Sequence, residues 1–161
     1  MVFVTVGTHE QQFNRLVEAI DALAASELSG EEVFIQTGYS DYEPTNAKWS
    51  KFVPATEMAS MMEKADVVVT HGGPSSFIEA MAAGKTPIVV PRRADLDEHV
   101  NDHQIEFVEL VAERQGGIIP CLDVEKLYDA IEKARISSRE SAFESHNAEF
   151  CSDLAKLIER L

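Results

Sequence analysis

Short apolar, β-branched runs alternate with segments of helical periodicity along the chain, and this alternation constrains the fold more than any other sequence feature. The run at 66–70 (DVVVT) is typical, because its apolar residues are consecutive and do not alternate with polar ones. Strands of this kind are buried on both faces, as in a parallel sheet with helices on each side. We therefore predict the α/β class: a single Rossmann-like, doubly wound parallel sheet of about six strands, with residues 1–161 as one domain.

The positions of the elements follow from the same periodicities and from the turn and capping residues between them. The expected strands are 2–6, 33–36, 51–53, 66–70, 86–90 and 118–120. The expected helices are 13–23, 57–64, 77–83, 99–114, 123–135 and 140–160, with Thr56 and Ser75 as caps of the second and third. The last helix has an apolar seam that could pack on the chain's own core or on a partner, namely Phe143, Asn147, Phe150, Leu154, Leu157 and Leu161.

Acidic residues outnumber basic ones by 28 to 14, and the formal net charge is −14. Residues 95–161 carry −9 of this charge, from 16 acidic and 7 basic residues. An acidic surface repels nucleic-acid backbones and anionic lipid headgroups, which argues against a nucleic-acid-binding protein and against direct docking on a membrane. Solubility alone can account for the charge; a partner, if there is one, is expected to be basic.

The two cysteines, Cys121 and Cys151, form neither a CxxC pair nor a disulfide pattern, so reduced thiols and a cytoplasmic location are expected. The N-terminal apolar run ends at Gly7 and lacks the basic leader of a signal peptide. No apolar run approaches the ~20 residues that span a bilayer.

Two polar loops follow the first and fourth expected strands, GTHEQ at 7–11 and HGGPSS at 71–76. Ligands of open α/β sheets bind beyond the carboxyl ends of the strands, so these loops form the candidate site. In the second loop, Gly72 and Gly73 let backbone approach a ligand, while Ser75, Ser76 and a helix N-terminus suit a phosphate or diphosphate. The alternative is a tight turn with a serine cap and no ligand. Neither GxGxxG nor a P-loop is present.

Other side chains near these loops allow more than one interpretation. Glu79, one turn into the helix after the second loop, suits the hydroxyls of a ribose, or simply a helix dipole. His9 or Glu10 could act as a general base or could cap the first helix. Arg92 and Arg93 could meet a phosphate, although solvation is expected for at least one of them.

Residues at the start of the expected helix 99–114 raise the question of a metal. His99 and His103 are spaced i, i+4, which could place them on one helix face as zinc ligands. The Glu of HExxH is missing and no third ligand stands out, so we expect no metal site. His103 and Gln104 are better suited to hydrogen-bonding a sugar.

Taken together, these segments resemble the C-terminal, donor-binding domain of family 28 glycosyltransferases, which have the GT-B architecture. The resemblance rests on residues 4–8, 65–80, 84–91 and 99–104, in the family's order across nearly the whole chain. It is strongest to the stand-alone subunits of bacterial capsule and exopolysaccharide galactosyltransferases, in which GTHEQ is followed by FNRL as at 13–16. The catalytic subunit of the eukaryotic dolichol-linked N-acetylglucosaminyltransferase is also similar. Ser75 departs from the family, which often has glycine there.

The resemblance implies a role for each matching residue. The Gly-Gly loop with its serines would hold the donor diphosphate, Glu79 the ribose, and His103 with Gln104 the donor sugar. His9 and Glu10 are the candidate general bases within the chain. The residues expected to bind the donor are Gly7, Thr8, His71, Gly72, Gly73, Ser75, Ser76, Glu79, His103 and Gln104.

The resemblance also implies a reaction and partners. We expect an inverting hexosyltransferase subunit that uses a UDP-sugar, with galactose as the expected sugar, and that needs no metal or other cofactor. The acceptor would be a lipid-linked saccharide of capsule or exopolysaccharide synthesis. A membrane-anchored second polypeptide would supply the acceptor site and recruit the chain to the inner face of the cell membrane. The rival interpretations are a non-catalytic UDP-sugar-binding scaffold, a sugar-nucleotide 2-epimerase and a flavodoxin-like regulatory domain.

Overall fold

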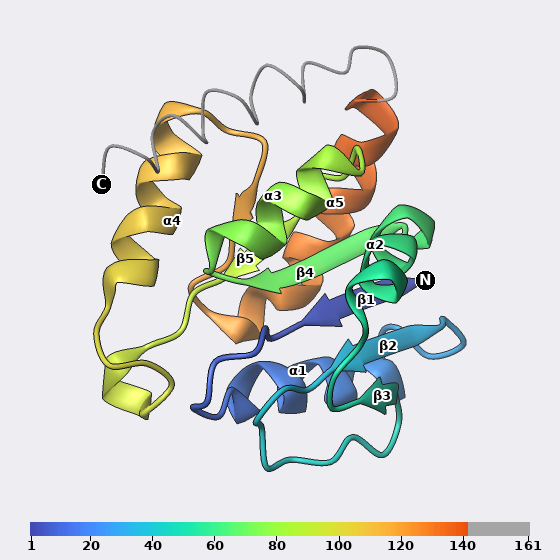
Figure 1. Ribbon diagram of the computed structural model, residues 1–161. Coiled ribbons are helices and arrows are strands. Elements are labelled where there is room, and N and C mark those ends of the chain that lie inside the picture. The colour runs from blue at the N-terminus through green and yellow to red at the C-terminus, as the bar shows by residue number, and fades with distance from the viewer. Residues whose placement is uncertain (142–161) are drawn as a thin grey trace.

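The computed structural model describes residues 1–141, with side chains to Ser137, and these residues form a parallel sheet covered by helices on both faces (Figure 1). The strands are β1 (Val2–Thr5), β2 (Val33–Gln36), β3 (Lys48–Ser50), β4 (Val67–His71), β5 (Ile88–Val90) and β6 (Ile119–Pro120). They pair in the order β3-β2-β1-β4-β5-β6, and every pair is parallel. The predicted fold class is confirmed.

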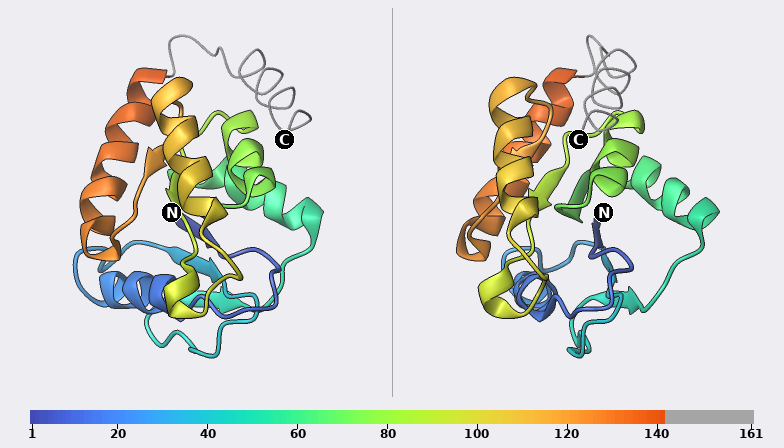
Figure 2. Two further views of the ribbon diagram at one scale, coloured as in Figure 1. Left: turned by 90° about the vertical axis from the view of Figure 1, so that its left-hand side faces the viewer. Right: turned by 60° about the vertical axis from the view of Figure 1, so that its left-hand side comes forward.

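Helices cover the sheet because successive strand residues point to opposite faces. On one face, Val4 and Val69 pack in a single cluster with residues of α1 (Asn14–Ala25) and α5 (Leu127–Ser141). On the other, Phe3 and Val68 pack against α2 (Ala55–Lys64) and α3 (Pro74–Ala82), and Val89 packs against α3 and α4 (His103–Arg114). Both views in Figure 2 show α5 and α2 on opposite sides of the sheet. Each fully buried valine contributes roughly 1.5–3 kcal/mol to folding.

The strand order reverses direction between β1 and β4. From β1 the chain winds outward to β2 and β3, and from β4 it winds the other way to β5 and β6. The connections after β1 and β4 therefore leave the sheet toward opposite faces, and a crevice opens between them beyond the carboxyl ends of these strands. The two loops singled out in the sequence border this crevice.

The third strand lies earlier than predicted, at Lys48–Ser50 instead of 51–53. Lys48 and Trp49 are exposed on the edge of the sheet, so β3 lacks the continuous apolar pattern of the central strands. Beyond Ser50, the carbonyl of Lys51 accepts hydrogen bonds from the backbone of Gly38 (2.9 Å) and the side chain of Gln36 (3.0 Å). The prediction placed the strand on the more apolar residues that follow.

Two helices begin before the residues expected to cap them. The N-cap of α2 is Pro54, whose carbonyl accepts from the amides of Glu57 (3.0 Å) and Met58 (2.9 Å), and Thr56 lies inside the first turn. The N-cap of α3 is Gly73, and Pro74 is its first residue. Proline is favoured there because its fixed φ already fits a helix and it has no N–H to satisfy.

The last two predicted helices also differ from the structure. Helix α4 begins at His103, not at residue 99, because the chain first forms the 3₁₀ helix η1 (Ala94–Leu96) and a loop. A second 3₁₀ helix, η2 (Val124–Lys126), precedes α5. Helix α5 is continuous across the break expected near residues 135–140, where the sequence has no glycine or proline. Most of the predicted helix 140–160, with its seam and Cys151, lies outside the described residues.

Candidate functional site

A pocket of about 470 Å³ lies in the crevice between β1 and β4. Its walls come from the loop after β1, the ends of β2 and β4, and the helices α2 and α3. The lining residues are Thr5, Gly7, Thr8, His9, Gln36, Met58, Met62, His71, Ser75, Ser76 and Glu79. Both predicted loops thus contribute to one cavity.

Hydrogen bonds at the ends of β1 and β2 shape one wall. The hydroxyl of Thr5 donates to Oε1 of buried Gln36 (2.6 Å) and accepts from the amide of Gly7 (3.2 Å). Nε2 of Gln36 donates to the carbonyl of Gly7 (3.1 Å). Gly7 has φ +77°, which favours glycine, so the chain can turn into the pocket here. The prediction missed Thr5 and Gln36, although a polar residue at the end of a buried strand was a usable signal.

The ring of His71, the last residue of β4, lies so close to Gly7 and Gly73 that neither position has room for a side chain. A Cβ atom on Gly7 would lie 2.5 Å from Cε1 of His71, and one on Gly73 would lie 2.3 Å from its Nε2. Both positions therefore need glycine to admit the imidazole ring. Burial, followed by the nearby charge of Arg92, lowers the pKa of His71 to about 4, so the ring is neutral at physiological pH.

Gly72 makes room for a second side chain. A Cβ atom there would lie 2.8 Å from Oε1 of Gln104, which accepts a hydrogen bond from the amide of Arg92 (3.0 Å). Gln104 therefore lies beside the Gly-Gly loop but outside the pocket lining, and His103 is exposed at the start of α4. The paired glycines thus have a packing role that the sequence did not reveal, and their approach to a ligand stays a prediction.

The N-terminus of α3 forms the polar end of the pocket. No side chain caps this helix, so the expected cap by Ser75 is wrong, and Ser75 and Ser76 line the pocket from the first turn. The first amides of a helix have no partner within it and carry a partial positive charge. With two hydroxyls beside them, they form a site suited to a phosphate or diphosphate.

Further residues set the chemistry of the remaining walls. Glu79 lies one turn along α3, exposed at the pocket, where its carboxylate can accept hydrogen bonds from ligand hydroxyls. Met58 and Met62 of α2 supply an apolar wall that the sequence did not single out. The pocket thus combines a polar end suited to an anion, a carboxylate that can accept hydrogen bonds from hydroxyls, and an apolar surface.

The two candidate bases lie in different surroundings. His9 lines the pocket, and its ring stacks on His99 with centroids 4.7 Å apart. Glu10 is exposed and lies outside the lining. The fold therefore brings His9, but not Glu10, to the cavity.

Arg92 is a structural residue, and the idea that it meets a phosphate is wrong. Its side chain is 0% exposed and lies over the ring of Phe13, 4.7 Å from the centroid. The guanidinium donates to the carbonyls of Val6 (2.9 Å), Gln11 (2.9 Å), Gln12 (3.0 Å) and Glu98 (3.0 Å). Burial lowers its pKa to about 10, against the opposing effect of Glu98, and it stays charged.

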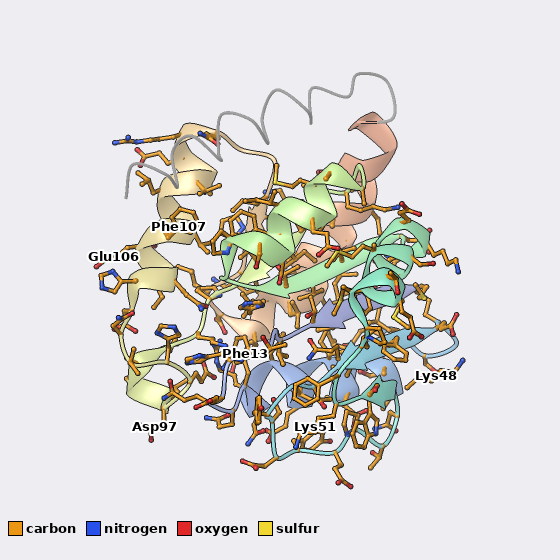
Figure 3. All side chains as sticks on the ribbon, viewed as in Figure 1. Phe13, Lys48, Lys51, Asp97, Glu106 and Phe107 are labelled. Atoms are coloured by element: carbon orange, nitrogen blue, oxygen red, sulfur yellow. The ribbon has the colours of Figure 1, made fainter. Side chains whose placement is uncertain are left out.

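An ion pair also connects the segments that follow β1 and β5, which Arg92 bridges. Arg15 pairs with both carboxylate oxygens of buried Glu98, each at 2.9 Å. Figure 3 shows Phe13 and Asp97 on the loops that follow β1 and β5, with Asp97 at the lower left edge of the molecule and Phe13 nearer its centre. Arg92 and this pair hold the two loops together. Arg93 points elsewhere and pairs with Asp95 (2.7 Å).

His99 and His103 do not lie on one helix face, as their i, i+4 spacing had suggested. His99 precedes α4 and stacks on His9, whereas His103 is the first residue of the helix. Within residues 1–141, no group of three or more His, Cys, Asp or Glu side chains could hold a metal ion.

Over the same residues, no helix is both long and apolar enough to cross a bilayer.

Comparisons with known proteins agree with this fold. A glycosyltransferase of kitacinnamycin aligns over 99% of this chain and 42% of its own, with a TM-score of 0.59 and 24% identity. The glycosyltransferase SnogD from Streptomyces nogalater aligns over 97% of this chain and 43% of its own, with a TM-score of 0.53 and 20% identity. At these identities the likeness concerns the fold alone.

Sequence comparison supports the same relationship. The UDP-N-acetylglucosamine--N-acetylmuramyl-(pentapeptide) pyrophosphoryl-undecaprenol N-acetylglucosamine transferase of Bdellovibrio bacteriovorus is 32% identical over 89 residues, which is 51% of this chain and 24% of that protein. The chain thus matches about a quarter of this relative's length. A profile of the glycosyltransferase family 28 C-terminal domain matches residues 1–161, and the chain belongs to that family.

Proposed function

We propose that this chain is the donor-binding, catalytic subunit of an inverting hexosyltransferase that moves a sugar from a UDP-sugar to a lipid-linked saccharide. The observation that carries the proposal is the pocket, where the N-terminus of α3, Ser75, Ser76 and Glu79 line one cavity at the switch point of the sheet. Family membership supports the reaction class. The Bdellovibrio relative, whose name includes a UDP-sugar and an undecaprenol-linked acceptor, supports the substrate classes.

The diphosphate of the donor would lie at the N-terminus of α3. As the bond between the sugar and the phosphate oxygen breaks, the electron pair stays on UDP, and the amides and hydroxyls there stabilise the added charge. This arrangement requires no metal ion. Glu79 would accept hydrogen bonds from the ribose hydroxyls, with Gly7 and Thr8 on the opposite wall.

The donor sugar would extend toward the loop after β5. Oε1 of Gln104 is already used by the amide of Arg92, so the amide nitrogen of Gln104, with His103, is left to meet the sugar. His9 is the preferred base because it lines the pocket, and Glu10 is the second candidate. The base takes the proton of the acceptor hydroxyl as its oxygen attacks the anomeric carbon opposite UDP, which inverts that centre.

We propose galactose as the sugar and capsule or exopolysaccharide synthesis as the setting, on the GTHEQ and FNRL segments. The name of the Bdellovibrio relative favours N-acetylglucosamine as the second candidate. Release of UDP from UDP-galactose and from UDP-N-acetylglucosamine, measured side by side with one membrane preparation as acceptor, distinguishes the two donors.

Removing the carboxylate of Glu79 is expected to weaken UDP binding by about 10–100-fold, because charge-assisted hydrogen bonds to the ribose are lost. Calorimetric titration of UDP into the wild type and Glu79→Ala, with EDTA present throughout, measures this. Glu109→Ala is the matched control, since Glu109 is an exposed glutamate in the second turn of α4 and lies outside the pocket.

Three results of this titration would count against the proposal. A wild-type chain that does not bind UDP contradicts the donor site. Equal losses in both variants would mean that only overall charge matters. Binding that requires added Mg²⁺ would refute the metal-free diphosphate site.

We also propose a membrane-anchored subunit with a basic face, which supplies the acceptor site and recruits this chain to the inner face of the cell membrane. The −9 charge of residues 95–161 supports a basic partner. The affinity of the two subunits is then expected to fall at least about tenfold between 50 and 500 mM NaCl, since salt screens exposed charges. An affinity that does not change with salt would rule out this electrostatic contact.

A further inference from the structure

His9 is held by two side chains, one from its own loop and one from the loop after β5. Its Nε2 lies 2.9 Å from Oε1 of Gln11. Its ring stacks on His99 with an interplanar angle of 28°. A side chain that lines an open pocket would otherwise sample several rotamers, so these two contacts restrict the direction in which the ring nitrogens point.

The amide of Gln11 is itself oriented by a backbone carbonyl. Its Nε2 donates to the carbonyl oxygen of Asp97 at 3.3 Å. Since a carbonyl can only accept, the amide nitrogen must face Asp97 and the amide oxygen must face His9. Asp97 has φ 55°, the one positive φ of a non-glycine residue between residues 1 and 141, so the chain adopts an uncommon conformation beside this contact.

This orientation determines which nitrogen of His9 carries a hydrogen. Oε1 of Gln11 can only accept, so Nε2 of His9 must be the donor. In a neutral imidazole the other nitrogen, Nδ1, then has the free lone pair. The two hydrogen bonds, from Gln11 to the Asp97 carbonyl and from His9 to Gln11, thus select the Nε2–H tautomer of His9.

Arg92 holds the backbone of Gln11 close to the loop that contains Asp97. One nitrogen of its buried guanidinium donates to the carbonyls of both Gln11 (2.9 Å) and Glu98 (3.0 Å). Gln11 and Asp97, which lie 86 residues apart in sequence, are therefore held in register by a contact that does not involve His9.

His71 from β4 and His99 from the loop after β5 both interact electrostatically with His9, and the charge of Arg92 acts on both. Burial and the charge of Arg92 lower the pKa of His71 to about 4. Burial, then His9 and Arg92, also lower the pKa of His99. The ring of His71 is therefore neutral near pH 7 and does not repel a proton that arrives on His9.

We propose that Gln11 is the positioning residue of the general base, holding His9 as its Nε2–H tautomer so that Nδ1 takes the proton of the acceptor, with His99 supporting the ring. In the transfer, the acceptor O–H bond breaks and its proton goes to Nδ1. The acceptor oxygen bonds to the anomeric carbon, and UDP leaves with the electron pair of the bond that breaks. This inference rests on the proposed function, because it takes His9 to be the base.

The first test needs no substrate. In the isolated chain, ¹H–¹⁵N NMR of the histidine rings reports the tautomer of His9 and the pH midpoint of its protonation. Gln11→Leu is expected to give a mixture of tautomers. Gln11→Glu, which puts a carboxylate against Nε2, is expected to raise the midpoint by about one pH unit or more.

Gln12→Leu is the matched control for these variants. Gln12 is the next residue, and its Nε2 donates to the carbonyl of Leu96 at 3.0 Å, one residue before Asp97. It therefore ties the same two loops together through the same kind of bond but does not orient His9. It is expected to leave the tautomer and the midpoint of His9 as in the wild type.

The second test follows release of UDP from UDP-galactose, with membranes of the cells that make the chain as the source of acceptor and partner. Gln11→Leu is expected to lower kcat about tenfold with an almost unchanged KM for the donor, because it affects the base and not donor binding. Gln11→Glu should restore kcat and move the acidic limb of the pH–rate profile upward by as much as the NMR midpoint moves. Gln12→Leu should change neither.

The outcomes separate this inference from the proposed function. An Nδ1–H tautomer in the wild type, or a Gln11→Leu variant with the tautomer and kcat of the wild type, would overturn the role of Gln11 while leaving the enzyme intact. Failure of the wild type to bind UDP, or to release it from either UDP-galactose or UDP-N-acetylglucosamine, would instead refute the proposed function, and the NMR result would still decide how Gln11 acts on the ring.

Discussion

Arg92→Leu is expected to lower the free energy of unfolding by about 3–5 kcal/mol and to weaken UDP binding. Leucine fills much of the buried space but leaves four carbonyls, those of Val6, Gln11, Gln12 and Glu98, without their donor. The loops after β1 and β5 would then separate, and the first of them lines the pocket. Urea denaturation followed by circular dichroism, together with UDP titration under conditions where the variant is folded, measures both effects.

The adjacent arginine provides the control. Arg93 carries the same charge one residue later, but it makes a surface ion pair with Asp95, and such pairs contribute little to stability. Arg93→Leu is therefore expected to stay close to the wild type in unfolding and in UDP binding. Similar losses of unfolding free energy in the two variants, or a loss under about 1 kcal/mol for Arg92→Leu, would show that the hydrogen bonds of Arg92 do not hold the two loops together.

Asp21→Ala is expected to destabilise the protein by about 3–5 kcal/mol. Asp21 is 0% exposed on α1 and holds the segment between β2 and β3. Its carboxylate accepts from the hydroxyl of Tyr42 (2.9 Å) and from the amides of Thr45 (3.0 Å), Asn46 (2.8 Å) and Ala47 (2.9 Å). Urea denaturation at pH 7 measures the loss, and those three amides should exchange faster with deuterium.

The effect of Asp21 should also depend on pH. Burial opposes its charged form, but the hydrogen bonds outweigh burial and lower the pKa from 3.8 to about 2. A lowered pKa stabilises the fold above the unfolded value, so about 2 kcal/mol should be lost as the pH falls from about 4 to about 2. Asp21→Ala should lack this acid-induced loss, whereas Asp41→Ala, at an exposed carboxylate of the same loop, should retain it. An identical acid profile for Asp21→Ala and the wild type would contradict the assignment.

The sequence predicted the central strands better than the edge. Residues 67–69 are consecutively apolar because β4 is buried on both faces, and this requirement is visible in any window that covers the strand. Strand β3 is paired on one side only and has Lys48 and Trp49 exposed, so its pattern resembles a loop. What makes it a strand is its pairing with β2, which no local pattern encodes.

Within the candidate site, the sequence indicated which residues would line the pocket where their position along a strand was enough. Gly7 and Ser75 lie shortly after β1 and β4, His71 is the last residue of β4, and the carboxyl ends of parallel strands meet at one edge. Position along a strand was less informative for Arg92, because its hydrogen-bond partners lie as far as 86 residues away in the sequence. A lone arginine after a strand looks the same whether it will bind a phosphate or four carbonyls.

The sequence by itself determined the fold class with its central strands, the edge of the sheet at which the candidate site lies, and the family, because each depends on local residue patterns and on the order of the elements. Only the tertiary structure decided that His9 lines the pocket while Glu10 does not, that the glycines admit His71 and Gln104, and that Gln11 orients His9. These contacts depend on how the loops after β1, β4 and β5 pass one another. That geometry is set by the packing of the sheet and by buried polar groups such as Arg92, which must find partners far away in the chain.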